Sequence, residues 1–384
     1  METYGLEKLG LVNAGAVYRN LTPAQLVEHA LRRGEGTLSN TGALVVKTGK
    51  YTGRSANDKF IVDTPAVHDD IAWGKVNRPF EKAKFDAIRA KVLAYLQGRD
   101  VFIFDGFAGA DPKYTKAFRI VNELASQNLF IHQLLRRPTA EQLKDFHEDY
   151  TIIAAPGFKC VPDIDGTRSE AAILVDYEAR EVVICGTQYA GEIKKSVFSV
   201  MNYVLPKQGV FPMHCSANIG KNGDSAVFFG LSGTGKTTHL RLWRQYLGSR
   251  VTVVNGDKPF LSLEPDGTVR VWGSPWAGKE RWQSPISVPL CGVCLLERGT
   301  DRICRLPPEQ ALTPLFRQTY HRDDPALEYL TLGFLDALLR RVPVYRLTCG
   351  MTDDAVRCSF EALTGLPYEK YRRPDGCGEE GSAL

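Results

Sequence analysis

The sequence predicts a mixed α/β (α+β) fold in two domains. The chain has 384 residues, enough for two separate hydrophobic cores. Helix-like and strand-like segments alternate through its first half, and residues 205–209 interrupt that pattern with proline and glycine. We therefore expect an N-terminal domain over 1–205 and a second domain over 206–370. Residues 371–384 are rich in glycine and glutamate and poor in apolar side chains, which predicts a disordered tail.

Local signals define the elements of the first half. Thr22 opens a capping box with Gln25 and is followed by proline at the first helical position, which predicts a helix ending near Gly34. Thr139 opens a second capping box and a second helix. Periodicity and residue type predict further helices over 80–96, 113–124 and 192–205, strands over 42–48, 101–104 and 129–135, and a hairpin of 171–176 with 181–187.

The second half mixes the same two kinds of element. The sequence Glu264-Pro-Asp-Gly267 predicts a hairpin turn. Buried strands are predicted over 225–229, 251–254 and 344–347, and helices over 238–247, from Pro307-Pro308 onward and over 326–341.

The composition is that of an ordinary globular protein. A net charge of +4 is small for this length, so we expect no nucleic-acid partner and no membrane partner. The first residues lack the basic start and apolar core of a signal peptide, and no apolar run approaches the length of a membrane span. Nine scattered cysteines, an odd number, favour a reducing compartment. We therefore expect a cytoplasmic monomer.

The segment between strand 225–229 and helix 238–247 fits the phosphate-binding pattern G-x-x-x-x-G-K-[ST]. It reads Gly230-Leu231-Ser232-Gly233-Thr234-Gly235-Lys236-Thr237-Thr238. The glycines let backbone N–H groups surround phosphate oxygens, and the helix N-terminus adds a favourable dipole. Lys236 is placed to reach the β- and γ-phosphates, and Thr237 to bind a divalent cation. Strand, loop, lysine, threonine and helix together predict a nucleoside triphosphate site.

Three other polar segments stand out, and each has an ordinary explanation when taken alone. Residues 49–59 form a glycine-rich, cationic loop around Arg54, whose guanidinium suits a carboxylate or a phosphate, although such a loop is usually just solvated. Residues 187–195 contain Tyr189 and two adjacent lysines, which are usually a wet helix face. Residues 213–218 contain His214, and a single histidine there is more often a hydrogen-bonded core residue.

Together, in this order and at this spacing, residues 49–59, 187–195, 213–218 and 228–238 resemble the ATP-dependent phosphoenolpyruvate carboxykinases. The resemblance covers roughly the first 240 residues. It implies an N-terminal domain for oxaloacetate and phosphoenolpyruvate, and a P-loop domain for ATP and metal ions. The implied reaction, a step of gluconeogenesis, converts oxaloacetate and ATP into phosphoenolpyruvate, ADP and carbon dioxide.

The resemblance also implies roles for single residues. Arg54 would hold the substrate carboxylate, and Tyr189 would line the substrate and carbon dioxide pocket. Lys195 and His214 would bind Mn²⁺, with Asp257 as a further ligand, and Lys195 would also contact substrate. A lysine that binds a metal must be neutral, and the nearby cation and Lys194 would lower its pKa.

The remaining roles concern phosphate. Lys194 would face the transferred phosphoryl group. Ser232 and the loop glycines would cradle the phosphates, with Lys236 on the β- and γ-oxygens. Thr237 would bind a second metal ion, Mg²⁺. These assignments make Arg54, Lys194, Lys195 and Lys236 the expected catalytic residues.

The chain departs from the family pattern after about residue 240. The family follows its P-loop with a strand ending Gly-Asp-Asp, whereas this chain has Asn255-Gly256-Asp257-Lys258-Pro259. We align Asp257 with the second, metal-binding aspartate. The family's adenine-binding segment and long C-terminal part have no counterpart. Residues 255–350 instead resemble the nucleotide domains of HPr-kinase-like proteins.

Two alternatives therefore stay open: a P-loop kinase acting on another acceptor, and a nucleotide-binding sensor without catalysis. The set Arg54, Tyr189, Lys195 and His214 favours the carboxykinase, because a sensor needs neither a substrate arginine nor manganese ligands. Residues 272–281 also have two interpretations. They could close over the phosphates and place Lys279 or Arg281 on the γ-phosphate, or form a turn that packs its tryptophans.

Overall fold

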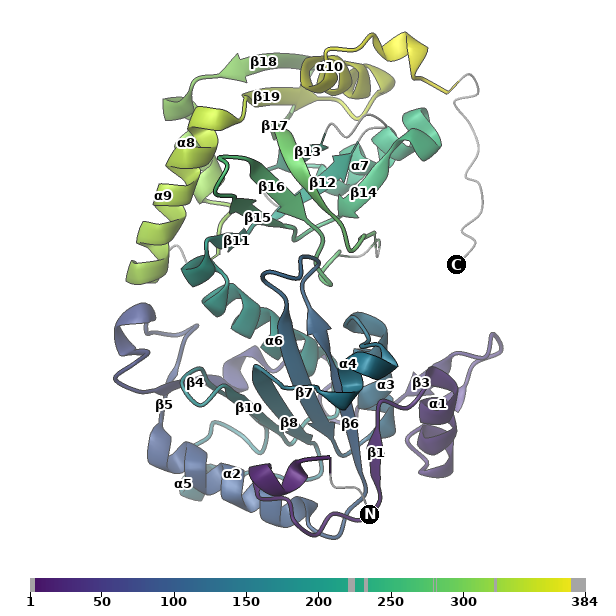
Figure 1. The fold of residues 1–384 in the computed structure, drawn as a ribbon, viewed down its shortest axis with the longest axis vertical. Helices are drawn as coiled ribbons and strands as arrows, with labels where there is room; N and C mark the ends of the chain where they lie inside the picture. Colours follow the sequence, from purple (N-terminus) through teal and green to yellow (C-terminus); the bar gives the residue numbers. More distant parts are fainter. Residues whose placement is uncertain are drawn as a thin grey trace. The chain divides into compact units, whose positions relative to one another are not determined.

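The structure is a computed structural model that describes residues 4–219, 225–230, 234–278, 280, 282–320 and 323–373. The chain divides into two compact units. The first comprises the residues up to Ala108 together with Thr115–Met201. The second comprises Gly109–Tyr114 and the residues from Asn202 onward. Each contains its own sheet and helices, so the predicted mixed α/β class is confirmed (Figure 1).

A mixed sheet forms the centre of the first unit. Its strands lie in the order β1 (Val17–Arg19), β6 (Val101–Ala108), β7 (Lys116–Asn122), β8 (Tyr150–Ala155), β10 (Glu181–Cys185), β9 (Ala172–Asp176), β4 (Lys59–Asp63) and β5 (Pro79–Glu81). The predicted hairpin is confirmed, because β9 and β10 pair antiparallel with Glu181 opposite Asp176. A separate small hairpin joins β2 (Gly36–Leu38) and β3 (Leu44–Val46).

Helices cover both faces of this sheet. They are α1 (Pro23–Arg32), α2 (Lys82–Leu96), α3 (Ala125–Leu134), α4 (Ala140–Lys144), α5 (Pro162–Asp165) and α6 (Gly191–Val204), the last of which continues into the second unit. Alternate β6 residues point to opposite faces. Val101 and Ile103 pack in the core with α2, whereas Phe102 packs with Leu26 of α1 and Leu129 of α3. Both predicted capping boxes are present.

Two predicted elements of the first unit are wrong. Residues 113–124 were expected to be helical, but they contain β7, an inner strand between β6 and β8. Such a strand is buried on both faces, so its sequence lacks the alternation of polar and apolar residues that indicates a half-buried strand. Residues 129–135 were expected to be a strand, but they belong to α3. Its first N–H groups, at Ala125 and Ser126, donate to the Glu35 carboxylate, and no local sequence pattern shows such a distant cap.

In the sheet of the second unit, the strand that precedes the segment 230–238 is an inner strand. Its strands lie in the order β11 (Val210–Pro212), β15 (Phe260–Leu263), β16 (Val269–Trp272), β17 (Ser287–Arg298), β13 (Ser225–Phe229), β12 (Cys215–Ile219) and β14 (Thr252–Asn255). From β17 the sheet also continues to β19 (Val344–Cys349) and β18 (Arg302–Leu306). The predicted turn at residues 264–267 joins β15 to β16, with Gly267 at φ +85°.

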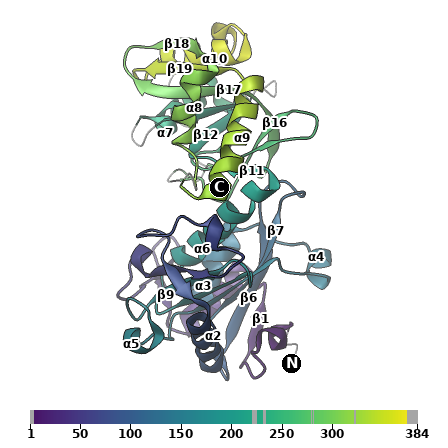
Figure 2. The same cartoon turned by 90° about the vertical axis from the view of Figure 1, so that its left-hand side faces the viewer.

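Four helices of the second unit lie in two layers within the described residues. They are α7 (Lys236–Leu247), α8 (Pro308–Phe316), α9 (Pro325–Arg341) and α10 (Asp353–Thr364). Val227 and Phe229 of β13 pack in the core with α8 and α9, which lie side by side (Figure 2). Ala226 and Phe228 pack with α7 and α10 on the other face. The central strand is thus buried on both faces, as its apolar sequence predicts.

The end of the described chain is held against this unit. The rings of Tyr371 and Phe360 lie 5.4 Å apart, and the Arg373 N–H donates to the Tyr246 carbonyl at 2.7 Å. The rest of the predicted tail, residues 374–384, lies outside the described residues. Over the part of the chain that is described, no helix is both long and apolar enough to cross a lipid bilayer.

Candidate functional site

Three polar segments of the second unit meet at one edge of its sheet. Strand β12 runs antiparallel to both of its neighbours, β13 and β14, and Cys215 lies opposite Phe229. The residue before β12 therefore lies at the same edge as the residues that follow β13 and β14. His214 precedes β12, the P-loop follows β13, and Asp257 follows β14. Pairing alone thus gathers segments that are distant in sequence.

Gly230 and Gly235, at the two ends of the loop after β13, occupy positions that suit glycine. A Cβ atom on Gly230 would lie 2.2 Å from the Thr234 hydroxyl oxygen, so a side chain there would collide. Gly235 caps α7 in the left-handed conformation, at φ +100°. Leu231, Ser232 and Gly233, which were expected to cradle phosphate, lie outside the described residues.

Lys236 is the first residue of α7 and is 8% exposed. Its Nζ donates a hydrogen bond to the Gly230 carbonyl oxygen at 2.7 Å, so the side chain folds back across the loop. Burial lowers the pKa of Lys236, because a charged ammonium is poorly solvated there. Thr237 and Thr238 follow in the first turn of the helix and are half-buried.

His214 and Asp257 form a pair beside this loop. Their Nε2 and Oδ1 atoms lie 3.4 Å apart, and both side chains are partly exposed. Burial acts to raise the pKa of Asp257, but hydrogen bonds from His214 and Lys258 outweigh it and hold the pKa below its ordinary value. Asp257 is therefore an ionised carboxylate next to an imidazole nitrogen. Oxygen and nitrogen donors of this kind suit Mn²⁺.

The described residues at 278 and 282 lie against the Asp257 turn. Gly256 donates its N–H to the Trp282 carbonyl at 2.9 Å, and a Cβ atom on Gly278 would lie 3.0 Å from the Asp257 Cβ. Trp272 and Trp276 are buried, so the aromatic packing that was one interpretation of this segment is present. Lys279 and Arg281, the two cations proposed for the γ-phosphate, lie outside the described residues.

Three residues around the His214–Asp257 pair were not predicted from the sequence to belong to the site. Lys258 makes an ion pair with Asp257, and its place next to that aspartate could have suggested the contact. Burial is the main cause that raises the pKa of both Tyr320 and Cys215. The charge of Asp257 raises both pKa values further, whereas the charge of Lys236 lowers that of Cys215. Tyr320 lies 63 positions beyond Asp257, and no local pattern connects the two.

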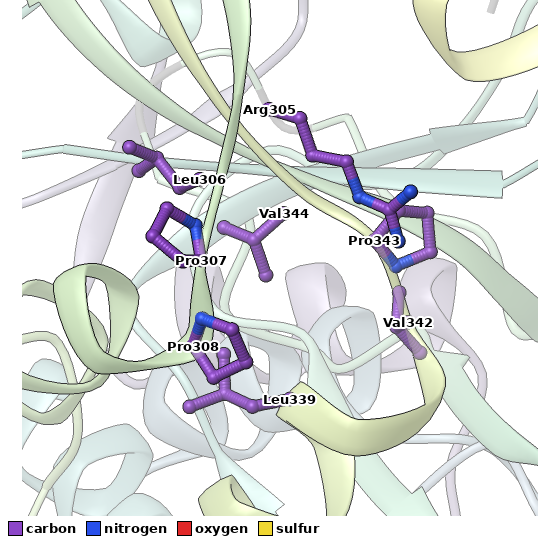
Figure 3. A pocket seen from close by; sticks show the side chains of 8 residues that line it. All are labelled: Arg305, Leu306, Pro307, Pro308, Leu339, Val342, Pro343 and Val344. Atoms are coloured by element: carbon purple, nitrogen blue, oxygen red, sulfur yellow. The ribbon is translucent and has the colours of Figure 1, made fainter.

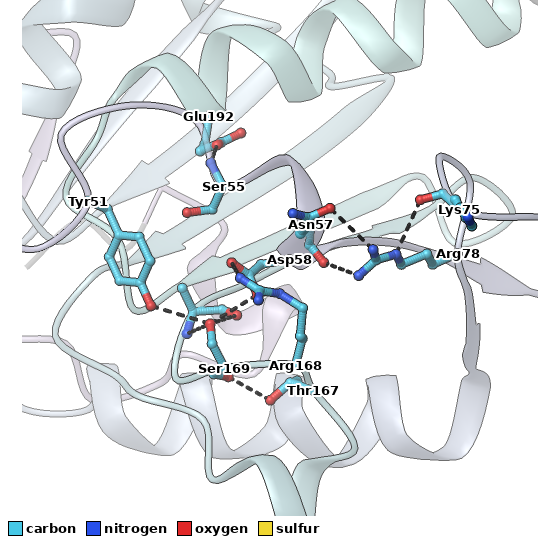
Figure 4. Close-up of polar contacts among 11 residues, drawn as sticks. Tyr51, Ser55, Asn57, Asp58, Lys75, Arg78, Thr167, Arg168, Ser169 and Glu192 are labelled. Atoms are coloured by element: carbon cyan, nitrogen blue, oxygen red, sulfur yellow. Dashed lines mark hydrogen bonds and ion pairs between the residues drawn. The ribbon is translucent and has the colours of Figure 1, made fainter.

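The Arg54 loop of the first unit is fastened at several points (Figure 4). Asp58 is fully buried and makes a two-point ion pair with Arg168, at 2.9 and 3.1 Å. The Arg78 guanidinium donates to the carbonyl oxygen of Asn57 at 2.6 Å. Arg54 itself is exposed. The loop is therefore anchored a few residues beyond Arg54, which is itself exposed to solvent.

The predicted residues of segment 187–195 lie at the start of α6, and the same unit holds Arg54. The Tyr189 N–H donates to the Thr187 hydroxyl at 3.2 Å, and a Cβ atom on Gly191 would collide with the Tyr189 ring at 2.3 Å. The Lys195 ammonium lies 4.7 Å from the centre of the Phe198 ring. The backbone N–H of Lys194 donates to the carbonyl oxygen of Ala190 at 3.4 Å, at the start of the helix.

The predicted Mn²⁺ ligands come from both units. Lys195 belongs to the first unit, whereas His214 and Asp257 belong to the second. Within the described residues, no three His, Cys, Asp or Glu side chains are grouped as a metal site. A manganese site that includes Lys195 therefore stays a prediction.

Two cavities lie away from these segments. The one in the second unit, about 380 Å³, is bounded by β18, β19, α8 and α9 (Figure 3). The one in the first unit, about 480 Å³, is lined mainly by charged residues near β1 and β7, such as Arg19 and Arg119. Neither is lined by a predicted site residue.

A buried strand, a glycine turn and a helix that begins with a lysine are typical of P-loop phosphate-binding proteins. The comparison with protein families is more specific. Residues 15–244 match the family described as phosphoenolpyruvate carboxykinase. The chain belongs to this family.

Named relatives match the chain over a stretch of similar length. Phosphoenolpyruvate carboxykinase (ATP) 1 of Moorella thermoacetica is 63% identical over 236 residues, which is 62% of this chain and 45% of that protein. The enzyme named phosphoenolpyruvate carboxykinase (ATP) in Fusobacterium nucleatum is 61% identical over 236 residues, 61% of this chain and 45% of that protein. The matched stretch thus spans less than half the length of these relatives.

Proposed function

We propose that this chain is an ATP-dependent phosphoenolpyruvate carboxykinase, a carboxy-lyase that converts oxaloacetate and ATP into phosphoenolpyruvate, ADP and carbon dioxide. One observation carries the proposal. The family match over residues 15–244 contains Arg54, Tyr189, Lys194, Lys195, His214 and the whole P-loop. A kinase for an unrelated acceptor would not need the substrate-binding residues Arg54 and Tyr189 in addition to a P-loop.

The second unit binds the nucleotide in this proposal. The N–H groups at the start of α7 hold phosphate oxygens, and Lys236 moves from the Gly230 carbonyl to the β- and γ-phosphates. The Lys236 ammonium already lies 2.7 Å from the Gly230 carbonyl oxygen, so groups at the loop are within its reach. This cation neutralises charge on the transferred group, which phosphoryl transfer requires.

The first unit binds the keto acid. Arg54 clamps a carboxylate through two N–H donors, and Tyr189 lines the pocket for the substrate and carbon dioxide. Lys194 faces the phosphoryl group as it moves, and Lys195 contacts the substrate. The carbon–carbon bond to the leaving carboxylate breaks and its electron pair forms an enolate of pyruvate. The enolate oxygen then attacks the γ-phosphorus, and ADP leaves.

Two metal ions belong to the proposal. Lys195, His214 and Asp257 would hold Mn²⁺, and Thr237 would hold Mg²⁺. The fit rests on the ionised Asp257 carboxylate beside the His214 nitrogen, and on the half-buried Thr237 in the first turn of α7. When bound, such cations polarise the keto acid and offset phosphate charge. Lys258, which now pairs with Asp257, must turn away when the cation binds.

A coupled assay tests the proposal. Purified protein is supplied with oxaloacetate, ATP, Mg²⁺ and Mn²⁺, and phosphoenolpyruvate is measured. We expect phosphoenolpyruvate and ADP in equal amounts, with turnover abolished when ATP is omitted. Phosphorylation of another acceptor without phosphoenolpyruvate would instead support the kinase alternative. ATP binding without any product would support the sensor. The substrates are small molecules, and we propose a cytoplasmic location and a monomer.

A further inference from the structure

Glu192 connects the Arg54 loop to the helix that carries the two lysines. It lies in the first turn of α6 and is 3% exposed. Its Oε1 atom accepts a hydrogen bond from the Ser55 N–H at 2.6 Å, across 137 positions of sequence. This bond can be followed in Figure 4. Ser55 is the next residue after Arg54, so the bond fastens the backbone directly beside Arg54.

Burial of the Glu192 carboxylate disfavours its charged form. Burial raises the pKa of Glu192, while the Ser55 N–H and the charges of Arg54 and Lys59 act in the opposite direction. A glutamate is rarely buried unless it is paired or hydrogen-bonded. A purely structural position could hold an apolar side chain instead. The position therefore suits a specific contact with the loop.

A second contact joins the same loop and helix. The Lys59 ammonium, at the start of β4, donates to the Ser199 hydroxyl at 2.9 Å, two helical turns beyond Glu192. The two contacts hold the end of the loop along one side of α6. Of the two, only the Glu192 contact lies next to Arg54.

We propose that Glu192 is a positioning residue, which clamps the Arg54 loop to the start of α6. Arg54 and the segment 189–195 then form a single preorganised surface for a small dicarboxylate. This inference rests on the proposed function for its substrate. Without the clamp, the loop would have to be ordered by each substrate molecule, which weakens binding of the keto acid but not of ATP.

Two substitutions separate the hydrogen bond from the charge. Glu192→Met keeps the length and fills the buried space, but cannot accept the Ser55 N–H. Glu192→Gln keeps an acceptor oxygen and removes the charge. We expect Glu192→Met to raise the KM for oxaloacetate at least about tenfold, with the KM for ATP within about twofold of wild type, because a hydrogen bond to a charged group is lost. Glu192→Gln should recover most of that loss, to within about threefold.

Hydrogen exchange of the loop gives a readout that needs no turnover. Peptides covering residues 49–59 are followed by mass spectrometry in all variants, without substrate. We expect faster exchange in Glu192→Met and near wild-type exchange in Glu192→Gln. The exposed Glu178, in the turn between β9 and β10, provides the control substitution Glu178→Ala.

The outcomes are distinguishable. If Glu192→Met folds, makes phosphoenolpyruvate and keeps both the wild-type KM for oxaloacetate and wild-type loop exchange, the positioning role is overturned. An equal rise in both KM values, or the same loss in Glu192→Gln, would indicate a general structural role and also overturn it. If the wild type makes no phosphoenolpyruvate, the proposed function fails, and loop exchange alone then decides whether Glu192 holds the loop.

Discussion

The Nζ atom of Lys236 lies 2.7 Å from the carbonyl oxygen of Gly230, the first residue of its own loop. The lysine is buried, and this carbonyl is the acceptor that its ammonium contacts in the described loop. A phosphate would offer stronger acceptors at the same place, because charge-assisted hydrogen bonds are the strong ones. The ammonium is therefore held ready beside the position expected for the phosphates.

This relationship predicts a large effect of Lys236→Ala on catalysis. We expect turnover to fall at least about a hundredfold, since in the proposed function the substitution removes a cation that acts on the transferring phosphoryl group. The melting temperature should change little. The coupled assay and a thermal melt on the same preparation measure both. Replacing the exposed Lys370 with alanine is the control. Wild-type turnover in a folded Lys236→Ala protein would show that this loop does not serve the chemistry.

Arg54→Lys separates substrate binding from nucleotide binding. Arginine offers two parallel N–H donors to a carboxylate, a geometry that lysine cannot reproduce. We therefore expect a strong loss of oxaloacetate-dependent turnover, with ATP affinity nearly unchanged in calorimetry. Arg32→Lys, on the exposed side of α1, controls for the exchange of one cation for another. Unchanged oxaloacetate turnover in Arg54→Lys would contradict the carboxylate clamp.

The Asp257 ion pair predicts opposite effects of two neighbouring substitutions. Asp257→Asn removes an ionised donor, so the Mn²⁺ concentration for half-maximal turnover should rise at least about tenfold. Lys258→Ala removes the ammonium that competes for the same carboxylate, so that concentration should fall. Mn²⁺ binding measured by electron paramagnetic resonance checks both without turnover. The same change in both variants would argue against a metal at Asp257.

Much of this arrangement could be predicted from the sequence where the deciding interactions are local. The capping boxes at Thr22 and Thr139 involve residues three positions apart, and both are present. The apolar strand 225–229 and the helix after the P-loop are also confirmed. Helix α3 was missed because the carboxylate that caps it belongs to Glu35, some 90 residues earlier.

The candidate site shows the same limit. The loop sequence alone predicts a phosphate-binding role for Lys236, and the family resemblance predicts a substrate-binding role for Arg54. The Ser55–Glu192 bond and the proximity of Tyr320 to Asp257 depend on tertiary structure, so no local pattern reveals them. Inner strand β7 was mistaken for a helix because burial on both faces removes the polar alternation of a strand.

His239 predicts how the stability of the second unit depends on pH. This residue of α7 is 2% exposed, and its Nε2 lies 3.0 Å from the Ser359 hydroxyl of α10 and 3.1 Å from the Trp243 ring nitrogen. Burial lowers the pKa of His239 from 6.5 to about 4. The unfolded chain therefore binds a proton more readily than the folded one. The contribution of the neutral, buried imidazole to the free energy of unfolding is fully present above the pKa of His239 in the unfolded chain. It is lost as the pH falls from about 6.5 to about 4.

Denaturant titrations at pH 7 and pH 4.5 test this prediction. Four of the five tryptophans lie in the second unit, so tryptophan fluorescence reports mainly on it. The free energy of unfolding should fall by on the order of 2–3 kcal/mol more in wild type than in His239→Gln, whose side chain stays neutral. His68→Gln is the control, because His68 is exposed in the first unit and its replacement should leave the acid limit of the second unit unchanged. A pH dependence that is the same in wild type and His239→Gln, with His68→Gln also unchanged, would mean that the buried imidazole does not set the acid limit of this unit.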